Sequence, residues 1–141
     1  MIYTTQSLEE TQCLAKEIAR NLSGRSTIFF MEGEMGAGKT TFAHFLAKEI
    51  NGQKISSSSF GLVNVYNGDR IVVHCDFYRQ HWDHEFYETE ILEHLDSSSV
   101  LILEWVSPFI LEPGVNTYRI KISIISPIER QIVVDPISLA S

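Results

Sequence analysis

The sequence of 141 residues predicts an α/β fold in which a mixed parallel and antiparallel sheet is flanked by helices. Three observations support this prediction. Residues 26–52 combine a buried-strand pattern, a glycine-rich loop and a helical pattern; residues 99–105 repeat the buried-strand pattern; and residues 60–78 and 117–135 have hairpin patterns. The length fits one domain, so we expect a single domain over residues 1–141.

The first expected element is a helix over "SLEETQCLAKEIARNLSG", residues 7–24. Ser7 stands three residues before Glu10, which is the capping-box arrangement, and Gly24 is the residue type best able to end a helix. Apolar residues recur at every fourth position, at Leu14, Ile18 and Leu22. This pattern is typical of a surface helix that packs one stripe on the core.

The next segment has the order strand, glycine loop, helix. "STIFFMEG", residues 26–33, is nearly all apolar and predicts a strand buried on both faces of a parallel sheet. "TTFAHFLAKEI", residues 40–50, has apolar residues at helical spacing, and Asn51-Gly52 is expected to end that helix.

The rest of the chain predicts two hairpins, a helix and a second buried strand. Asn67-Gly68 between "FGLVNVY" and "RIVVHCDFY" is a strong signal for an antiparallel hairpin. "EFYETEILEHL" is expected to be helical and "SVLILEW" to be a buried strand. "TYRIKISII" and "RQIVVD" are expected to form a closing hairpin.

Composition and charge restrict the possible partners. The formal charge of −7 and a pI of about 5.1 disfavour nucleic-acid backbones and anionic lipid, so we expect weak affinity for tRNA alone and no membrane association. The two cysteines, Cys13 and Cys75, have no paired spacing, and neither a signal-like start nor an apolar run near 18 residues is present. We therefore expect a reduced, cytoplasmic protein.

The motif "GEMGAGKTTF" matches the phosphate-binding pattern G-x-x-x-x-G-K-[ST] at Gly33, Gly38, Lys39 and Thr40. Glycines allow successive backbone N–H groups to point at phosphate oxygens, and the start of the following helix favours negative charge. Lys39 would carry a positive charge to the terminal phosphates, and the Thr40 hydroxyl would bind Mg²⁺. The sequence thus predicts a P-loop nucleotide-binding domain.

Two carboxylates are candidates to complete this site. Glu104 ends the buried strand "VLILE", where phosphate-loop proteins usually supply a carboxylate for Mg²⁺, although many strands end in an acidic residue without any such role. Asp76 in "HCDFYR" lies among apolar neighbours that make an idle carboxylate costly. It could orient or deprotonate the attacking water, or it could pair with Arg79 or cap a turn.

Two further segments have open interpretations. "SSSSF", Ser56 to Phe60, follows the phosphate-loop helix, where switch segments sense the third phosphate in other nucleotide hydrolases, but it could equally be a flexible loop of small residues. "HWDHE", residues 81–85, suggests zinc, yet its spacing fits no well-determined zinc pattern. Trp82 and Trp105 are more typical of packing than of base stacking, although Trp105 should lie near the nucleotide.

Four blocks, "GEMGAGKTTF", "SSSSFGLVNVY", "HCDFYR" and "LILEW", in this order and at these intervals, resemble the TsaE family, formerly called YjeE. The resemblance implies an ATPase with ATP and Mg²⁺ as cofactors, slow when alone, that serves the synthesis of threonylcarbamoyladenosine at position 37 of tRNA. It also implies that the protein acts on a complex of TsaD and TsaB, and on tRNA only indirectly, with ATP hydrolysis resetting that complex between turnovers.

By matching positions, the resemblance implies that Lys39, Asp76 and Glu104 are catalytic and that Thr40 and Glu104 hold Mg²⁺. The implied nucleotide contacts are Gly33, Glu34, Gly36, Ala37, Gly38, Lys39, Thr40, Thr41, Ser59 and Arg130. The sequence departs from the family's S-P-T-[FY]-T-[LI] pattern at Ser58, Ser59 and Gly61. Losing a proline and gaining a glycine would each cost roughly 0.4–1 kcal/mol if the native backbone suits the family's residues. We therefore expect a looser switch segment.

Two other function classes are compatible with a phosphate loop. A small-molecule kinase usually needs clustered arginines to hold an anionic substrate, whereas the six arginines here are scattered. A nucleotide-dependent binding module would use ATP without needing to hydrolyse it. No guanine-reading N-K-x-D motif is present, which favours ATP, and the chain is expected to be monomeric when alone.

Overall fold

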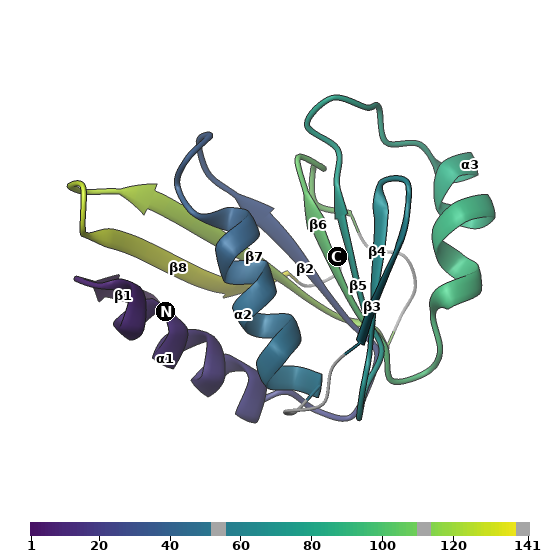
Figure 1. Cartoon of the computed structure of the whole chain (residues 1–141), viewed down its shortest axis with the longest axis horizontal. Helices are drawn as coiled ribbons and strands as arrows, with labels where there is room; N and C mark the ends of the chain where they lie inside the picture. Colours follow the sequence, from purple (N-terminus) through teal and green to yellow (C-terminus); the bar gives the residue numbers. More distant parts are fainter. Residues whose placement is uncertain (52–55, 110–113, 138–141) are drawn as a thin grey trace.

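The computed structural model describes residues 1–51, 56–109 and 114–137, and within them one eight-stranded sheet has the order β1-β8-β7-β2-β6-β5-β4-β3 (Figure 1). The elements, in chain order, are β1 (Ile2–Thr5), α1 (Leu8–Arg20), β2 (Thr27–Glu32), α2 (Lys39–Asn51), β3 (Ser56–Phe60), β4 (Val63–Asn67), β5 (Val72–Asp76), α3 (His84–Phe86) with a π-helical continuation (Tyr87–Ile91) and a 3-10 turn (Leu92–His94), β6 (Val100–Glu104), β7 (Asn116–Ile124) and β8 (Arg130–Pro136).

The sheet is mixed, as the sequence predicts. The four central strands, β7, β2, β6 and β5, run parallel, and antiparallel pairs flank them on both sides. All five residues of β6 are buried, because this strand lies in the middle of the sheet with a covering layer on each face. The parallel register aligns the carboxyl ends of β2, β5 and β6 at one edge of the sheet.

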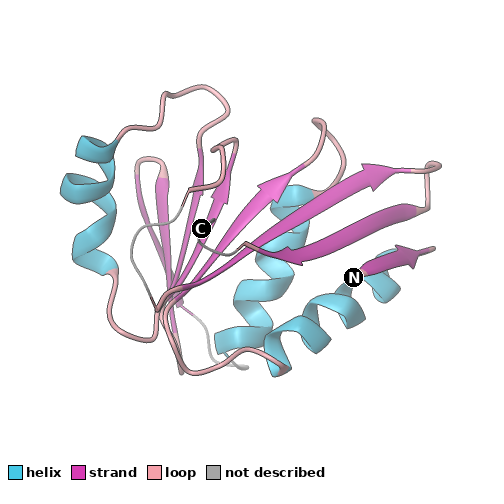
Figure 2. Cartoon of the chain, turned by 180° about the vertical axis from the view of Figure 1, so that it is seen from behind, coloured by secondary structure: helices cyan, strands magenta, loops and turns pink. Residues whose placement is uncertain are grey.

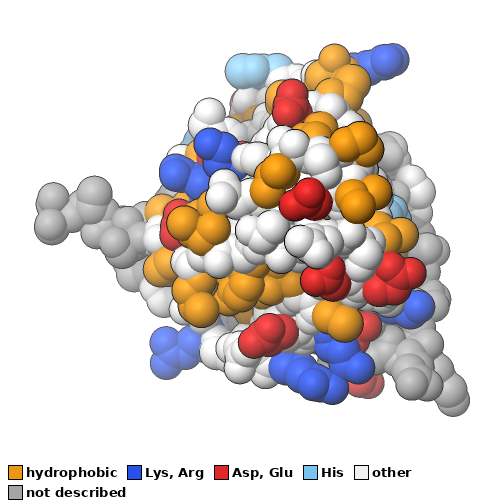
Figure 3. Space-filling view, turned by 90° about the vertical axis from the view of Figure 1, so that its left-hand side faces the viewer, with side chains coloured by type: hydrophobic (Ala, Val, Ile, Leu, Met, Phe, Trp, Pro, Cys, Tyr) orange, Lys and Arg blue, Asp and Glu red, His pale blue; other side chains and the backbone are white. Residues whose placement is uncertain are grey.

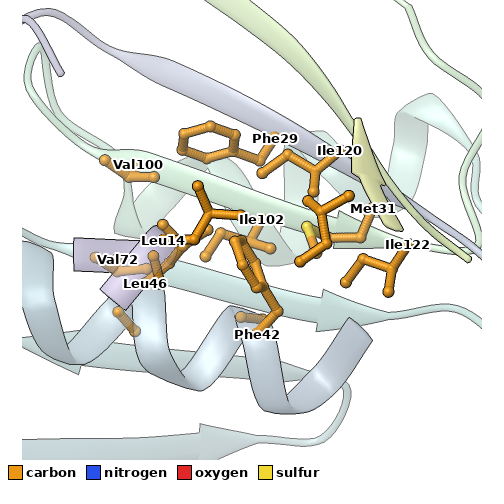
Figure 4. Packing of buried hydrophobic residues seen from close by; sticks show 14 of the residues in the cluster. Leu14, Phe29, Met31, Phe42, Leu46, Val72, Val100, Ile102, Ile120 and Ile122 are labelled. Atoms are coloured by element: carbon orange, nitrogen blue, oxygen red, sulfur yellow. The ribbon is translucent and has the colours of Figure 1, made fainter. Parts of the chain in front are cut away.

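Helices cover both faces of the sheet. Helices α1 and α2 lie on one face, and the helix that begins with α3 lies on the other (Figures 1 and 2). Successive side chains of β2 point to opposite faces of the sheet. Phe29 and Met31 pack with α1 and α2 (Figure 4). Ile28 and Phe30 belong to the cluster on the α3 side. The strand is therefore apolar on both faces from Ile28 to Met31, which is the pattern that identified it in the sequence.

Helix α1 begins as predicted but ends earlier than Gly24. The Ser7 hydroxyl accepts a hydrogen bond from Glu10 N at 3.1 Å, and the Glu10 carboxylate accepts one from Gln6 N at 2.9 Å. The helix ends at Arg20, because the following Asn21 donates its side-chain amide to Glu17 O at 2.9 Å and caps the last turn.

The hairpin predicted around Asn67-Gly68 forms between β4 and β5, with Tyr66 opposite Val72. Its glycine is required for space. A Cβ atom at Gly68 would lie 2.7 Å from Asn51 Cβ and 2.8 Å from Asn51 O, so only glycine allows the turn to pack this closely on the end of α2.

The segment "SSSSF" forms an edge strand, β3, instead of the loop that the sequence suggested. It pairs antiparallel with β4 across the two-residue turn Gly61-Leu62, and Gly61 has a φ of 69°. A threonine would be strained in that conformation, so the expected loosening at Gly61 does not hold. Strand β1, which pairs with β8, is a further element that the sequence analysis missed.

None of the helices described is long and apolar enough to cross a membrane. Asp83, from the "HWDHE" segment, caps α3 by accepting a hydrogen bond from Phe86 N at 2.7 Å.

Candidate functional site

The glycine loop connects the end of β2 to the start of α2 and requires glycine for its backbone. Gly33, Gly36 and Gly38 have φ values of 148°, 83° and 107°, which residues with a side chain rarely adopt. A Cβ atom would find nothing within 4 Å at Gly36 and Gly38, so that side of the loop is open. The first turn of α2 carries no acidic residue, and its positive end is therefore not neutralised by its own side chains.

Lys39, the first residue of α2, is buried with its ammonium group inside the loop. Its Nζ donates hydrogen bonds to Gly33 O and, at 3.3 Å, to Glu34 O, and it lies 4.0 Å from the centroid of the Trp105 ring. Desolvation lowers the pKa of Lys39, while the charges of Glu104, Asp76 and Glu34 oppose that shift. Trp105 has a φ of 63° and is 42% exposed, so the residue after Glu104 has a rare backbone conformation at this site.

The carboxylates predicted to complete the site end two neighbouring parallel strands. Asp76 of β5 is paired in register with Glu104 of β6. The Thr40 hydroxyl lies 3.1 Å from each Glu104 carboxylate oxygen and donates a hydrogen bond to the carboxylate. Asp76 Oδ1 accepts a hydrogen bond from Tyr78 N at 3.0 Å, so the carboxylate caps the turn after β5, as one of its alternatives held, and this contact orients it. Among the described residues, Arg79, the alternative partner, forms no ion pair with Asp76.

These side chains line one cleft of about 320 Å³. The lining residues are Glu34, Met35, Gly36, Gly38, Lys39, Thr40, Thr41, Asp76, Tyr78, Glu104 and Trp105. The chain thus brings together the glycine loop, both predicted carboxylates and the expected neighbour Trp105. An ammonium group, a hydroxyl and two carboxylates at such a cleft could bind a phosphate together with a hard cation that prefers oxygen ligands.

A second cavity, of about 510 Å³, lies on the other side of the glycine loop. It is lined by Gln6, Ser7, Leu8, Thr11, Gly36, Ala37, Gly38, Thr41, Ile122, Pro127, Ile128, Arg130 and Ile132. Figure 3 views the molecule from the end that carries β1 and the β7–β8 turn, where exposed hydrophobic side chains lie among acidic ones. Arg130 Nε donates to Ala37 O at 3.0 Å and so connects β8 to the glycine loop.

Ser59 lines neither of these two cavities. It is exposed on β3, opposite Asn64, two strands away from β5. Its contact with a nucleotide stays a prediction.

His74 is a site residue that the sequence analysis missed. It is 4% exposed, and its Nε2 lies 2.5 Å from Glu104 Oε2. The ring centroids of His74 and His44 are 6.1 Å apart, and the two rings pack edge to face. His44 Nδ1 lies 2.9 Å from the Tyr66 hydroxyl. Desolvation and, secondarily, His74 lower the pKa of His44. The available signals were a histidine inside the apolar strand pattern "IVVHC" and its place as the first residue of the block "HCDFYR".

Comparisons with known proteins agree on one family. The family model described as "Threonylcarbamoyl adenosine biosynthesis protein TsaE" matches residues 5–132. A protein of Rickettsia prowazekii with the name tRNA threonylcarbamoyladenosine biosynthesis protein TsaE is 33% identical over 129 residues, which is 86% of each chain. Relatives with the same name in Rickettsia conorii and Aquifex aeolicus are 36% and 44% identical over 74% and 52% of this chain.

The matched part spans 60% of the Rickettsia conorii protein and 58% of the Aquifex aeolicus protein. Among solved structures, the crystal structure of Bacillus subtilis YdiB superposes with a TM-score of 0.71 at 25% sequence identity. That superposition covers 98% of this chain and 86% of YdiB.

Proposed function

The chain belongs to the TsaE family of threonylcarbamoyl adenosine biosynthesis proteins, and from this premise and the geometry of the cleft we propose that it binds and hydrolyses ATP with Mg²⁺. The hydrolysis would serve the synthesis of threonylcarbamoyladenosine in tRNA, and residues 1–141 would act as one ATPase domain. The observation that carries the proposal is the cleft in which Lys39, Thr40, Asp76 and Glu104 meet beside the glycine loop.

The donor set of the cleft fits Mg²⁺. Thr40 and Glu104 offer a hydroxyl and a carboxylate within 3.1 Å of each other, and Mg²⁺ prefers oxygen ligands of this kind. When bound, Mg²⁺ would neutralise charge on the phosphate oxygens. For the phosphates themselves, the open side of the loop at Gly36 and Gly38 supports close approach of an anion to the backbone N–H groups.

Each catalytic side chain has a proposed task. Lys39 would exchange its carbonyl partners at Gly33 and Glu34 for oxygens of the terminal phosphates. Asp76, oriented by the Tyr78 N–H group, would accept a hydrogen bond from the attacking water and direct it at the terminal phosphorus.

The nucleoside half of ATP would occupy the second cavity. Its volume of about 510 Å³ is in the ordinary range for ligand pockets, and it shares Gly36, Gly38 and Thr41 with the phosphate cleft. Leu8 and Ile128 offer apolar surface for a purine ring, and Arg130 would hold the loop between the two cavities through Ala37 O.

We propose TsaD and TsaB as the partners that use this hydrolysis, because membership of a threonylcarbamoyl adenosine biosynthesis family implies cooperation with the other proteins of that synthesis. The tRNA would be reached through that complex, in agreement with the formal charge of −7.

The ATPase proposal is tested by comparing the wild-type protein with Glu104→Gln and with the exposed control Glu88→Gln. Phosphate release from ATP should require Mg²⁺ and should fall at least about 100-fold in Glu104→Gln, because a charge that stabilises the transition state is lost. Glu88→Gln should hydrolyse ATP at the wild-type rate. Equal rates in wild type and Glu104→Gln, or GTP turned over as fast as ATP, would refute the proposal.

The pathway assignment needs a separate experiment with TsaD, TsaB and tRNA. Wild-type protein should co-purify with the two partners in an ATP-dependent manner and support many rounds of modification per complex. Glu104→Gln should not sustain repeated rounds. Full, repeated modification by a variant that cannot hydrolyse ATP would identify a nucleotide-dependent binding module instead.

A further inference from the structure

His74 is an unusual residue in the hydrophobic sheet. It lies in the middle of β5, on the face that α2 covers, and only 4% of its surface is exposed. A buried polar ring is costly unless its nitrogen atoms have partners. Its Nε2 meets that requirement with Glu104 Oε2 at 2.5 Å. A carboxylate that binds a cation only accepts hydrogen bonds, so in the proposed cation site Nε2 is the donor.

The contact restricts the Glu104 side chain, which is 2% exposed. Thr40 Oγ1 lies at the same distance, 3.1 Å, from both carboxylate oxygens. The Thr40 contact alone therefore does not distinguish the two oxygens. The bond from His74 does distinguish them, because it binds Oε2 from the adjacent strand and so fixes the rotation of the carboxylate.

The surroundings of His74 restrict its own movement. His44 lies four residues after Thr40 on α2, so the two share one face of the helix, and the His44 ring packs edge to face on His74 at 6.1 Å. The Tyr66 hydroxyl in turn lies 2.9 Å from His44 Nδ1. Side chains from α2, β4, β5 and β6 thus form one connected group that ends at the Glu104 carboxylate.

We infer that His74 is a positioning residue for cation binding: its Nε2–H group holds the Glu104 carboxylate in the orientation that faces Thr40, so that both oxygen donors meet the same cation. The inference rests on the proposed Mg²⁺-ATP site and adds to it a residue that does not touch the nucleotide. Outer residues that orient a metal ligand typically change metal affinity 10-fold to 100-fold when they are replaced.

The test measures cation binding directly, with Mn²⁺ as the probe and a non-hydrolysable ATP analogue present, by electron paramagnetic resonance. His74→Leu removes the donor at similar volume and should weaken Mn²⁺ binding about 10-fold to 100-fold. His74→Gln, which retains an N–H donor, should bind Mn²⁺ within about threefold of wild type. Affinity for the analogue in EDTA should be the same in all three proteins, because the phosphate loop is unchanged.

A double-mutant cycle separates positioning from packing. In a Glu104→Gln background, adding His74→Leu should weaken Mn²⁺ binding no further, because the group that His74 orients is already lost. If His74→Leu does not fold, His74→Gln is compared with His74→Asn, whose N–H donor is on a shorter side chain. The His74→Asn protein should then bind Mn²⁺ more weakly than the His74→Gln protein.

Wild-type Mn²⁺ affinity in His74→Leu, or an equal further loss in the Glu104→Gln background, would overturn the inference. Those results differ from a failure of the proposed function, in which the wild-type protein itself would not bind the analogue and Mn²⁺ together.

Discussion

The three loop glycines are required for different reasons, and Gly33 is the most constrained of them. Gly36 and Gly38 need glycine for their positive φ alone, because space is free around them. Gly33 has a φ of 148°, and a Cβ atom there would also lie 2.4 Å from Ile122 O on β7. Ile122 O is a backbone atom of the central sheet and cannot move aside, so any side chain at residue 33 must displace the loop itself.

Gly33→Ala should therefore destabilise the protein by about 2–3 kcal/mol and abolish ATP binding, because strain and a backbone clash act together at the start of the loop. Gly24→Ala is the matched control: Gly24 has no positive φ, and nothing lies within 4 Å of its Cβ position. It should change the free energy of unfolding by no more than about 0.5–1 kcal/mol, in the stabilising direction. Urea denaturation and ATP titration of both variants check this, and equal stability of the two would contradict it.

Residue types and their local spacing predicted much of the site. The glycine loop, Lys39 and Thr40 are contiguous in sequence, and Glu104 could be identified because it ends an apolar strand. His74 could not be identified in this way, because its role depends on a partner 30 residues away on the neighbouring strand. Such a contact follows from strand order and register, which local periodicity does not contain.

At the scale of elements, those with strong periodicity or full burial were predictable and the edge strands were not. Strands β2 and β6 are apolar on both faces, and α2 has apolar residues at helical spacing. Strand β1 is short and pairs with β8 near the other end of the chain, with Ile2 opposite Val133. Strand β3 contains four serines, which have little preference for strands, and it forms through the turn at Gly61.

The end of α2 is fixed to the β4–β5 turn by one side chain, that of Asn51, which is 1% exposed. Its Oδ1 accepts a hydrogen bond from Arg70 N at 3.1 Å, and its Nδ2 donates to Tyr66 O at 3.3 Å. The helix that begins at the glycine loop is thereby anchored at its far end to the β4–β5 hairpin, whose second strand supplies Asp76. Removing the amide would leave two backbone groups without this partner.

Asn51→Ala should lower the free energy of unfolding by about 1–3 kcal/mol, because it leaves buried hydrogen-bonding groups unpaired. Asn21→Ala removes a comparable bond, to Glu17 O, at an exposed helix end and should cost at most about 1 kcal/mol. Chemical denaturation of both variants gives the comparison. A smaller loss in Asn51→Ala than in Asn21→Ala would show that Asn51 does not anchor the helix.

In the molecule as a whole, the two cysteines differ in burial and therefore in how easily a thiol reagent reaches them. Cys13 is exposed on α1, whereas Cys75 is fully buried in β5 between Val63 of β4 and Leu103 of β6. Burial raises the pKa of the Cys75 thiol to about 12, so its reactive thiolate is scarce at neutral pH in the folded state. A thiol reagent can modify Cys75 only when the sheet or the layer that packs on its α3 side opens around it.

Cys75 belongs to the cluster on the α3 side of the sheet, and its strand β5 pairs with β6. An opening that separates β5 from β6 exposes Cys75 and also parts Asp76 from Glu104. If ATP binds the intact cleft alone, ATP at 100 times its dissociation constant stabilises the closed sheet by about 2.7 kcal/mol. Labelling of Cys75 by a disulfide reagent at pH 8 should then slow roughly 100-fold, while Cys13, which needs no opening, should react at the same fast rate with or without ATP.

The Cys13→Ser variant isolates the slow reaction, and mass spectrometry assigns the modified residue. Cys75 labelling that is unaffected by saturating ATP would show that β5 opens locally without loss of the nucleotide site, because only an opening that destroys the site is coupled to ATP binding.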